Sequence, residues 1–241
     1  MWNCKNGIIP EFFLEFVSDE NTRISYAASI GLSKLPEEHK ERFKEAVEKF
    51  DRISVREKTG AELVSAITDK NVETVLDPVF LLPARTWERI LVPPKDRGYI
   101  FVYGFDVSDR MKEYIKELRN RTKKKIISVY RHKGMPANCV VGPRIGPLEF
   151  LGYVHNADYI VTSSFHCTAF SLIFQKKMIV DHHGTTGSRT KDLLESVLYP
   201  ETPPLDKLDQ WISEKVDYQT IQVLLDQQIK KSAAFLKEAI T

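Results

Sequence analysis

The chain has 241 residues, of which 42% are hydrophobic and 28% charged, as in an ordinary globular protein. Its 35 basic and 33 acidic residues leave a formal net charge of +2, which argues against a dedicated nucleic-acid binder. No apolar run approaches the ~20 residues that a membrane-spanning helix needs, and Met1 does not open a basic-then-apolar signal peptide. We therefore expect no transmembrane segment and no nucleic-acid partner.

The first ninety or so residues alternate between apolar strands and amphipathic helices. Glu11–Val17 is apolar enough to belong to a core. The elements expected after it are strand Arg23–Ile30, a helix that follows Pro36, strand Ile53–Val55, helix Ala61–Ile67 and strand Val72–Leu76. This order is typical of a parallel sheet with helices on its faces. We assign residues 1–94 to a first Rossmann-like domain of the α/β class.

Leu82–Arg97 interrupts the alternation with three prolines and several charges, which indicates a short helix around Trp87 and then a linker. A second alternating unit follows. Its expected strands are Tyr99–Tyr103, Ile126–Tyr130, Tyr159–Val161 and Met178–Val180, and its expected helices are Asp109–Thr122, Leu148–Asn156, Cys167–Phe174 and Lys191–Val197. Helices at 205–214 and 218–239 end the chain. We assign residues 95–216 to a second Rossmann-like domain and 217–241 to a C-terminal helix.

The cysteines and histidines give little sign of a metal site. Cys4, Cys139 and Cys167 are odd in number, far apart and without a CxxC pair, which favours a reducing cytoplasm. Asp181-His182-His183 has the residue types of a metal site, but adjacent histidines on an extended segment point to opposite faces. We predict no bound metal.

Polar residues follow three of the expected strands: Arg56-Glu57, Gly104-Phe105, and Ser163 to Thr168. Ligands bind at the carboxyl ends of strands in open parallel sheets. An arginine suits a carboxylate or a phosphate because its planar fork donates two parallel hydrogen bonds. If the two domains face each other, these ends predict a cleft for a small anionic substrate. The alternative is that Arg56-Glu57 is only an ion pair at a helix start.

Residues 157–174 carry the strongest single signal. A strand runs into a small polar turn and then into an apolar helix, so N–H groups and the positive end of the helix dipole favour an anion there. His166 could carry a proton near neutral pH. The alternatives are that Ser163 or Ser164 merely caps the helix, that His166 is a surface residue, and that Cys167 is a nucleophile or a small buried residue.

Four blocks in order resemble the polysaccharide pyruvyl transferase family: ISVREKTG (53–60), VLDPVFLL (75–82), residues 146–174, and SRTKDLL (188–194). The resemblance implies a GT-B-like fold of two Rossmann-type domains, with a C-terminal helix that returns toward the first domain. It also implies transfer of a pyruvyl unit, as a ketal, from phosphoenolpyruvate to a sugar hydroxyl in surface polysaccharide or exopolysaccharide synthesis. The implied partners are phosphoenolpyruvate, as donor substrate, and a nucleotide- or lipid-linked sugar, with no further cofactor.

The resemblance also implies site residues. Arg56 matches the arginine expected to grip the phosphoenolpyruvate anion, and His166 matches the histidine expected at the catalytic centre. The expected substrate-binding residues are Ser163, Ser164 and Thr168 at the helix start, Gly104, Glu149 by analogy with GT-B proteins, and Arg189 as a weaker anion-binding candidate. In this scheme His166 is the acid/base or phosphate partner, and Arg56 neutralises the anion.

The chain departs from the family in three places. Ser164 stands where many members have an arginine, and Cys167 stands where a Gly or Ala is usual. The match begins in the middle of the family's first domain, so we expect a truncated first domain. A truncated domain would expose a sheet edge and favour a homo-oligomer. Two alternatives stay open: a non-catalytic remnant of the family, and a GT-B glycosyltransferase that uses a nucleotide sugar. The expected location is cytoplasmic, with peripheral attachment to the inner membrane face as an option.

Overall fold

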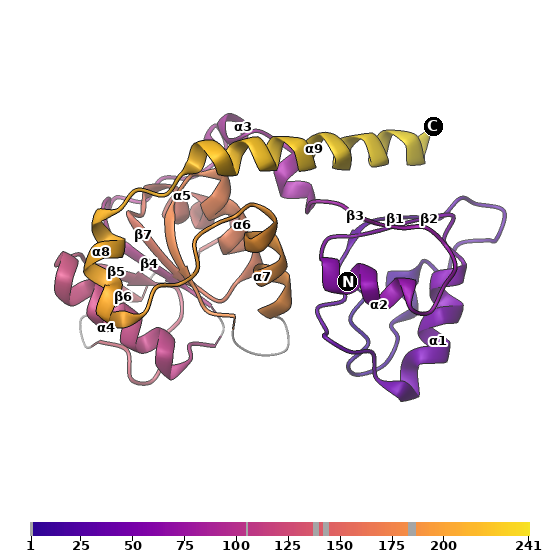
Figure 1. Cartoon of the computed structure of the whole chain (residues 1–241), viewed down its shortest axis with the longest axis horizontal. Coiled ribbons are helices and arrows are strands. Elements are labelled where there is room, and N and C mark those ends of the chain that lie inside the picture. Colours follow the sequence, from indigo (N-terminus) through magenta and orange to yellow (C-terminus); the bar gives the residue numbers. More distant parts are fainter. Residues whose placement is uncertain (1, 105, 137–139, 142–144, 183–186) are drawn as a thin grey trace. The chain divides into compact units, whose positions relative to one another are not determined.

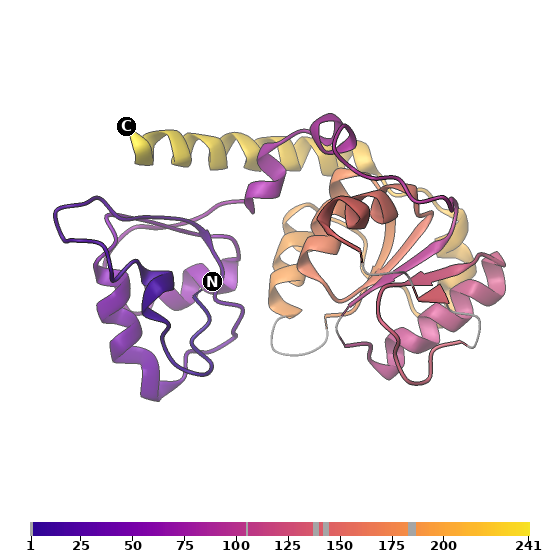
Figure 2. The ribbon, with the colours of Figure 1, turned by 180° about the vertical axis from the view of Figure 1, so that it is seen from behind.

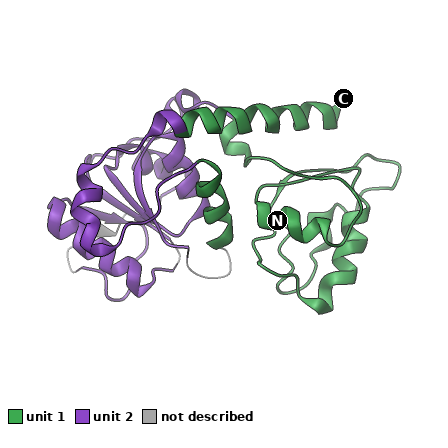
Figure 3. Cartoon of the chain, viewed as in Figure 1, with its two compact units in different colours: residues 1–81, 184–197, 221–241 green, residues 82–183, 198–220 purple. Residues whose placement is uncertain are grey.

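The computed structural model describes residues 2–104, 106–136, 140–141, 145–182 and 187–241. The chain divides into two compact units (Figure 3). Unit 1 comprises Met1–Leu81, Gly184–Val197 and Ile221–Thr241, and unit 2 comprises Leu82–His183 and Leu198–Thr220.

These units differ in two places from the domains predicted from the sequence, which are residues 1–94, 95–216 and 217–241. Unit 2 begins at Leu82 because the expected linker packs on it: the Trp87 ring lies 5.1 Å from that of Phe170, and the Val92 N–H donates to the Leu148 carbonyl at 3.0 Å. Residues 184–197 and most of the C-terminal helix belong to unit 1.

Unit 1 is built on a three-stranded parallel sheet in the order β1-β2-β3 (Figure 1). The strands are β1 (Ile24–Ala28), β2 (Arg52–Val55) and β3 (Val72–Thr74). Helices α1 (Glu37–Glu48) and α2 (Lys58–Ser65) connect them in turn. This βαβαβ order is the one that the alternation of apolar segments predicts.

Strand β1 is shorter than the expected Arg23–Ile30 because its pairing with β2 is irregular between Ser25 and Ala28. Ala27 adopts a φ of 53°, and its N–H donates to the Ser54 hydroxyl at 3.1 Å. The Ser54 hydroxyl donates in turn to the Ser25 carbonyl at 2.8 Å. The strand therefore bulges, and the chain turns beyond Ala28.

An aromatic cluster fills the core of unit 1. The Trp2 ring stacks on Phe13 at 5.2 Å and meets the edge of Phe50 at 5.0 Å, while Phe13 meets Phe43 at 5.5 Å. The expectation for Glu11–Val17 is only partly right, because η1 (Pro10–Phe13), a 3-10 helix, buries Phe13 and leaves Phe16 75% exposed. A second cluster packs α9 (Tyr218–Ile240) on the sheet through Phe235, whose ring lies 6.2 Å from Tyr26.

Unit 2 is built on a five-stranded parallel sheet in the order β6-β5-β4-β7-β8 (Figure 1 and Figure 2). The strands are β4 (Ile100–Tyr103), β5 (Ile126–Ser128), β6 (Val140–Val141), β7 (Tyr159–Thr162) and β8 (Lys177–Val180). The chain runs outward from β4 to β6, and then from β7 to β8 on the other side. The two-residue strand β6 was not predicted, because two valines carry too little pattern.

Helices cover both faces of this sheet, as its apolar strands require. Helices α4 (Asp109–Thr122) and α8 (Leu208–Ser213) contribute to one core cluster with Val102 and Val161. Helix α5 (Pro147–Asn156) carries rings that pack on Phe101 of β4, and Phe170 of α6 (Phe165–Ile173) packs on Phe150 of α5. The remaining short elements are η2 (Pro78–Leu81), α3 (Ala84–Glu88), α7 (Gly187–Ser196) and η3 (Leu205–Lys207).

Helix α4 has the bounds that the sequence predicts, because both of its ends carry local signals. The Ser108 hydroxyl accepts a hydrogen bond from the Met111 N–H at 3.1 Å, which caps the start. Lys123 takes a left-handed φ of 58°, and its N–H donates to the Arg119 carbonyl, which closes the end.

The expected α/β class with parallel sheets is confirmed. No described helix is long and apolar enough to cross a membrane.

The aromatic cluster gives a test of where the stability of unit 1 comes from. Phe43→Ala should lower the free energy of unfolding by about 3–5 kcal/mol, because it leaves a cavity beside Trp2 and Phe13. Phe16→Ala, the same change at an exposed ring, should stay within about 0.5 kcal/mol. Urea denaturation followed by tryptophan fluorescence measures both. Equal losses for the two variants would contradict this account of the core.

Candidate functional site

The expected site residues fall into two groups. Arg56 and Arg189 belong to unit 1, while Gly104, Glu149 and the residues from Ser163 to Thr168 belong to unit 2. Each group lies where the sheet and helices of its own unit place it.

In unit 2, Gly104 and Ser163 meet at the point where the strand order reverses. They follow the neighbouring parallel strands β4 and β7, from which the chain continues to opposite sides of the sheet. Ligands of open α/β sheets bind outside the carboxyl ends of strands at such a point. A Cβ on residue 104 would lie 2.4 Å from the Ser163 hydroxyl oxygen and 3.2 Å from the Asp106 carbonyl oxygen, so a side chain there would displace the Ser163 hydroxyl. The Ser163 hydroxyl donates to the Asp106 carbonyl at 3.2 Å.

The turn from β7 into α6 is fixed by its own hydroxyl groups. Thr162 Oγ1 donates to the Tyr103 carbonyl at 2.5 Å and accepts from the Ser164 N–H at 3.0 Å. The Ser164 hydroxyl caps α6 by accepting from the Cys167 N–H at 3.4 Å. Thr168 is fully buried and its hydroxyl donates to the Ser164 carbonyl at 3.0 Å. Thr168 therefore has a structural contact in this turn, and a substrate contact for it stays a prediction.

His166 lies in the first turn of α6 with its side chain exposed, and the Phe165 ring meets it edge-on at 5.6 Å. The positive end of a helix favours an anion at this position. The neighbouring Cys167 is fully buried, and burial raises the pKa of its thiol to about 12. A thiol this weakly acidic stays protonated at neutral pH, which favours the small buried residue over the nucleophile.

Glu149 has a local structural contact. It is the third residue of α5, and its Oε2 accepts from the Gly146 N–H at 3.1 Å, before the first turn of that helix. This is one half of a capping box, since Gly146 has no side chain to return the bond. A sugar contact for Glu149 stays a prediction.

In unit 1, Arg56 lies between two buried carboxylates. Its Nη1 is 2.5 Å from Asp77 Oδ2, and its Nε is 3.7 Å from Glu57 Oε2. The side chains of Arg56, Asp77 and Glu57 are 9%, 6% and 1% exposed. The ion pair with Glu57, one of the two alternatives for this motif, is therefore present. Asp77 follows β3 as Arg56 follows β2, so the second carboxylate comes from the adjacent strand end.

The Glu57 carboxylate also holds the turn that follows β1. Its Oε1 accepts hydrogen bonds from the Ser29 hydroxyl at 3.1 Å, the Ile30 N–H at 2.7 Å and the Gly31 N–H at 2.9 Å. Three donors satisfy Oε1 of this buried carboxylate, while Oε2 lies 3.7 Å from Arg56 Nε, an ion-pair distance without a hydrogen bond. The ends of all three strands of unit 1 thus meet around Glu57 and Arg56.

Arg189 of α7 joins this group although 132 residues separate it from Glu57 in the numbering of the chain. Burial, followed by the positive charge of Arg56, lowers the pKa of its guanidinium, while the negative charge of Glu57 raises it. A Cβ on Gly31 would lie 3.4 Å from Arg189 Nε, so the arginine lies directly against this turn. Arg56, Arg189, Glu57 and Asp77 form what we term the arginine cluster, with two positive and two negative charges.

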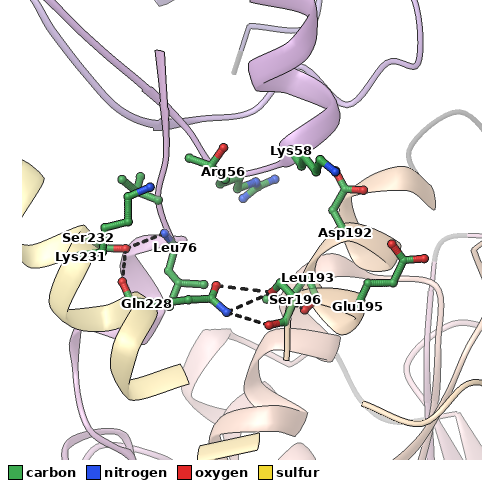
Figure 4. Close-up of a pocket in the computed structure, with 12 residues that line it drawn as sticks. Arg56, Lys58, Leu76, Asp192, Leu193, Glu195, Ser196, Gln228, Lys231 and Ser232 are labelled. Carbon is green, nitrogen blue, oxygen red and sulfur yellow. Dashed lines mark hydrogen bonds between the residues drawn. The ribbon is translucent and has the colours of Figure 1, made fainter. Parts of the chain in front are cut away.

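A pocket of about 430 Å³ opens beside Arg56 within unit 1 (Figure 4). It lies between the ends of β2 and β3 and the helices α7 and α9. Hydrogen bonds join the walls of this pocket. The Gln228 side chain donates to the Ser196 carbonyl at 3.0 Å, and the Ser232 hydroxyl accepts from the Leu76 N–H at 2.8 Å. The lining residues are Arg56, Lys58, Thr74, Val75, Leu76, Asp192, Leu193, Glu195, Ser196, Gln228, Lys231 and Ser232.

The set of expected site residues omitted Glu57 and Asp77. Both positions carry a signal that could have included them, since each follows a strand of the parallel sheet and one adjoins Arg56. Among the described residues, no group of three or more His, Cys, Asp or Glu is placed to hold a metal ion. Of the Asp181-His182-His183 segment, His183 lies outside the described residues, and the Asp181 carboxylate accepts a hydrogen bond from the Ser108 hydroxyl.

The fold is similar to that of several solved structures. A candidate UDP-N-acetylglucosamine 2-epimerase from Listeria monocytogenes matches with a TM-score of 0.55 and 9% identity over 88% of this chain and 72% of that chain. The glycotransferase of kitacinnamycin matches with a TM-score of 0.52 and 11% identity over 82% of this chain and 55% of that chain. These similarities support the GT-B class expected for the fold.

A UDP-GlcNAc 2-epimerase from Methanocaldococcus jannaschii matches with a TM-score of 0.46 and 14% identity over 69% of this chain. The chain spans 54% of the length of that epimerase. No protein with a curated description is significantly similar in sequence.

The sequence profile of one family agrees with the motifs around Arg56 and His166. The profile, described as polysaccharide pyruvyl transferase, matches residues 3–180 of the 241. It covers the arginine cluster apart from Arg189, and the whole of the turn between β7 and α6. Because the match extends over well more than half of the chain, this protein belongs to the polysaccharide pyruvyl transferase family.

Proposed function

We propose that the protein transfers a pyruvyl unit from phosphoenolpyruvate to a sugar hydroxyl in surface polysaccharide synthesis. The observation that carries this proposal is the arginine cluster, in which Arg56 and Arg189 lie together at the carboxyl edge of the unit 1 sheet. Family membership supplies the reaction class. We place the reaction in the cytoplasm, in keeping with the buried free thiols of Cys4 and Cys167.

The arginine cluster suits an anion that carries two negative groups. Phosphoenolpyruvate carries a carboxylate and a phosphate on the same carbon, and each can take a forked pair of hydrogen bonds from one guanidinium. In the structure Asp77 Oδ2 occupies one such position on Arg56, at 2.5 Å from Nη1. We infer that the substrate anion binds to the guanidinium groups of Arg56 and Arg189.

The reaction then needs a proton at the methylene carbon of phosphoenolpyruvate. An acid delivers that proton, and a sugar hydroxyl attacks the resulting cation-like carbon and gives its own proton to a base. A second hydroxyl forms the other carbon–oxygen bond of the ketal as the bond to phosphate breaks, and its proton leaves with the phosphate or to the base. We assign the acid and base steps to His166, at the start of α6.

The acceptor is a sugar linked to a nucleotide or a lipid in this proposal. The pocket beside Arg56 offers hydroxyl, amide and carboxylate groups of the kind that bind sugar hydroxyls, together with Lys58 and Lys231. A ligand held by Arg56 can extend into this space because Arg56 lines it (Figure 4). The acceptor need not touch the four residues of the arginine cluster.

The role of His166 is tested by turnover of phosphoenolpyruvate, measured as release of phosphate with a mixture of sugar acceptors. His166→Ala should reduce the rate at least about 100-fold, because the reaction loses its proton donor and acceptor. His39→Ala, on the partly exposed side of α1, is the matched control and should keep the wild-type rate. Wild-type turnover in His166→Ala would rule out this assignment. Saturation by UDP- or GDP-sugars without dependence on phosphoenolpyruvate would instead favour a glycosyltransferase.

The role of Arg56 is tested by calorimetric titration with phosphoenolpyruvate. Arg56→Lys should weaken binding about tenfold or more, since a lysine keeps the charge but cannot donate two parallel hydrogen bonds while it holds Asp77. The control is Arg52→Lys at the exposed first residue of the same strand, which should bind as the wild type does. Equal affinity in both variants would contradict a donor site at Arg56.

A further inference from the structure

We propose that Glu57 is a positioning residue of the donor site, which holds Arg56 and Arg189 in the geometry that binds the substrate anion. The proposal rests on the proposed function, because it names a residue that acts on the same site through the two arginines. Glu57 does not itself contact the anion in this proposal, since an anion and a carboxylate repel each other.

The Glu57 side chain has almost no freedom to move. It is 1% exposed, and three donors from the turn after β1 converge on its Oε1 at 2.7–3.1 Å. On its other side it lies against the backbone of α2, where a Cβ on Gly60 would be 3.1 Å from Glu57 Cγ. Glycine at position 60 therefore makes room for this carboxylate, and the fold fixes its position from two directions.

The second carboxylate oxygen sets the position of Arg56. Glu57 Oε2 lies 3.7 Å from Arg56 Nε, while Asp77 Oδ2 lies 2.5 Å from Nη1 of the same guanidinium. Two carboxylates on different edges of a planar group fix its orientation as well as its place.

The first carboxylate oxygen sets the position of Arg189 through the turn. Gly31, whose N–H donates to Oε1 at 2.9 Å, has a φ of 64°, and a Cβ at this residue would be 3.4 Å from Arg189 Nε. The Arg189 side chain thus rests on a surface that Glu57 holds in place. One carboxylate links both arginines, although Arg56 follows β2 and Arg189 belongs to α7.

A purely electrostatic role and a positioning role for Glu57 predict opposite changes in phosphoenolpyruvate affinity when Glu57 is removed. If Glu57 only neutralised the arginines, its removal would leave a more positive site and phosphoenolpyruvate would bind more tightly. If Glu57 positions the arginines, its removal lets the turn and the guanidinium groups move, and binding weakens. A displacement on the order of 1 Å can cost up to about a hundredfold where alignment matters.

The experiment is calorimetric titration of the full chain with phosphoenolpyruvate, for the wild type, Glu57→Gln and Glu57→Ala. We expect Glu57→Ala to bind about tenfold to a hundredfold more weakly. Glu57→Gln should lie between this variant and the wild type, because its amide oxygen can still accept from Ile30 and Gly31. Thr68→Ala is the control for lost stability, since Thr68 is a buried hydroxyl at the amino end of β3 that bonds Glu48.

Gly31→Ala is a second variant that leaves every charge in place. Its φ of 64° would be strained for an alanine and would shift the turn on which Arg189 rests, so it should also weaken binding while Thr68→Ala binds as the wild type does. Unchanged or tighter binding in both Glu57 variants would overturn the proposal. If Arg56→Lys weakens binding and the Glu57 variants do not, only this inference fails. If the wild type does not bind phosphoenolpyruvate, the proposed function fails and this inference with it.

Discussion

The buried carboxylate of Glu57 is the interaction on which the arginine cluster, and with it the proposed donor site, depends. A carboxylate that is 1% exposed must have its charge met by hydrogen bonds and by cations, and Glu57 takes three donors from the turn after β1 and faces Arg56. Asp77 forms a second ion pair with Arg56, and the Arg189 side chain lies against Gly31 of the same turn. The ends of three strands and one helix are thereby held in a fixed arrangement, from which the arginines can act on a single anion.

The parallel sheets explain why chemistry gathers at these places. In each unit the strands run in one direction, so the turns that follow them lie on one edge of the sheet. In unit 1 that edge carries the arginine cluster. In unit 2 the strand order reverses between β4 and β7, and the turn there presents His166 at the start of α6. The residues that we propose for anion binding and for proton transfer therefore each follow a strand of a parallel sheet.

Local sequence patterns predicted many of the helices and strands, but they did not predict contacts between residues that are far apart in the sequence. Helix Asp109–Thr122 has its predicted bounds because Ser108 and Lys123 mark its ends locally. The strand ends with Arg56 and with the Ser163–Thr168 turn were found from apolar runs alone. Three features that depend on distant partners were not: the contact of Arg189 with the Gly31 turn, the second carboxylate on Arg56, and the burial of Thr168. The bulge in β1 depends on Ser54, a residue of another strand.

The central claim is that Arg56 and Arg189 hold one substrate anion, and a double-mutant cycle on phosphoenolpyruvate affinity tests it most directly. Calorimetric titration would compare the wild type with Arg56→Lys, Arg189→Lys and the double variant. The account predicts that the wild type binds and that the losses in the two single variants are non-additive by about 0.5 kcal/mol or more. Strict additivity, or no binding by the well-folded wild type, would contradict it.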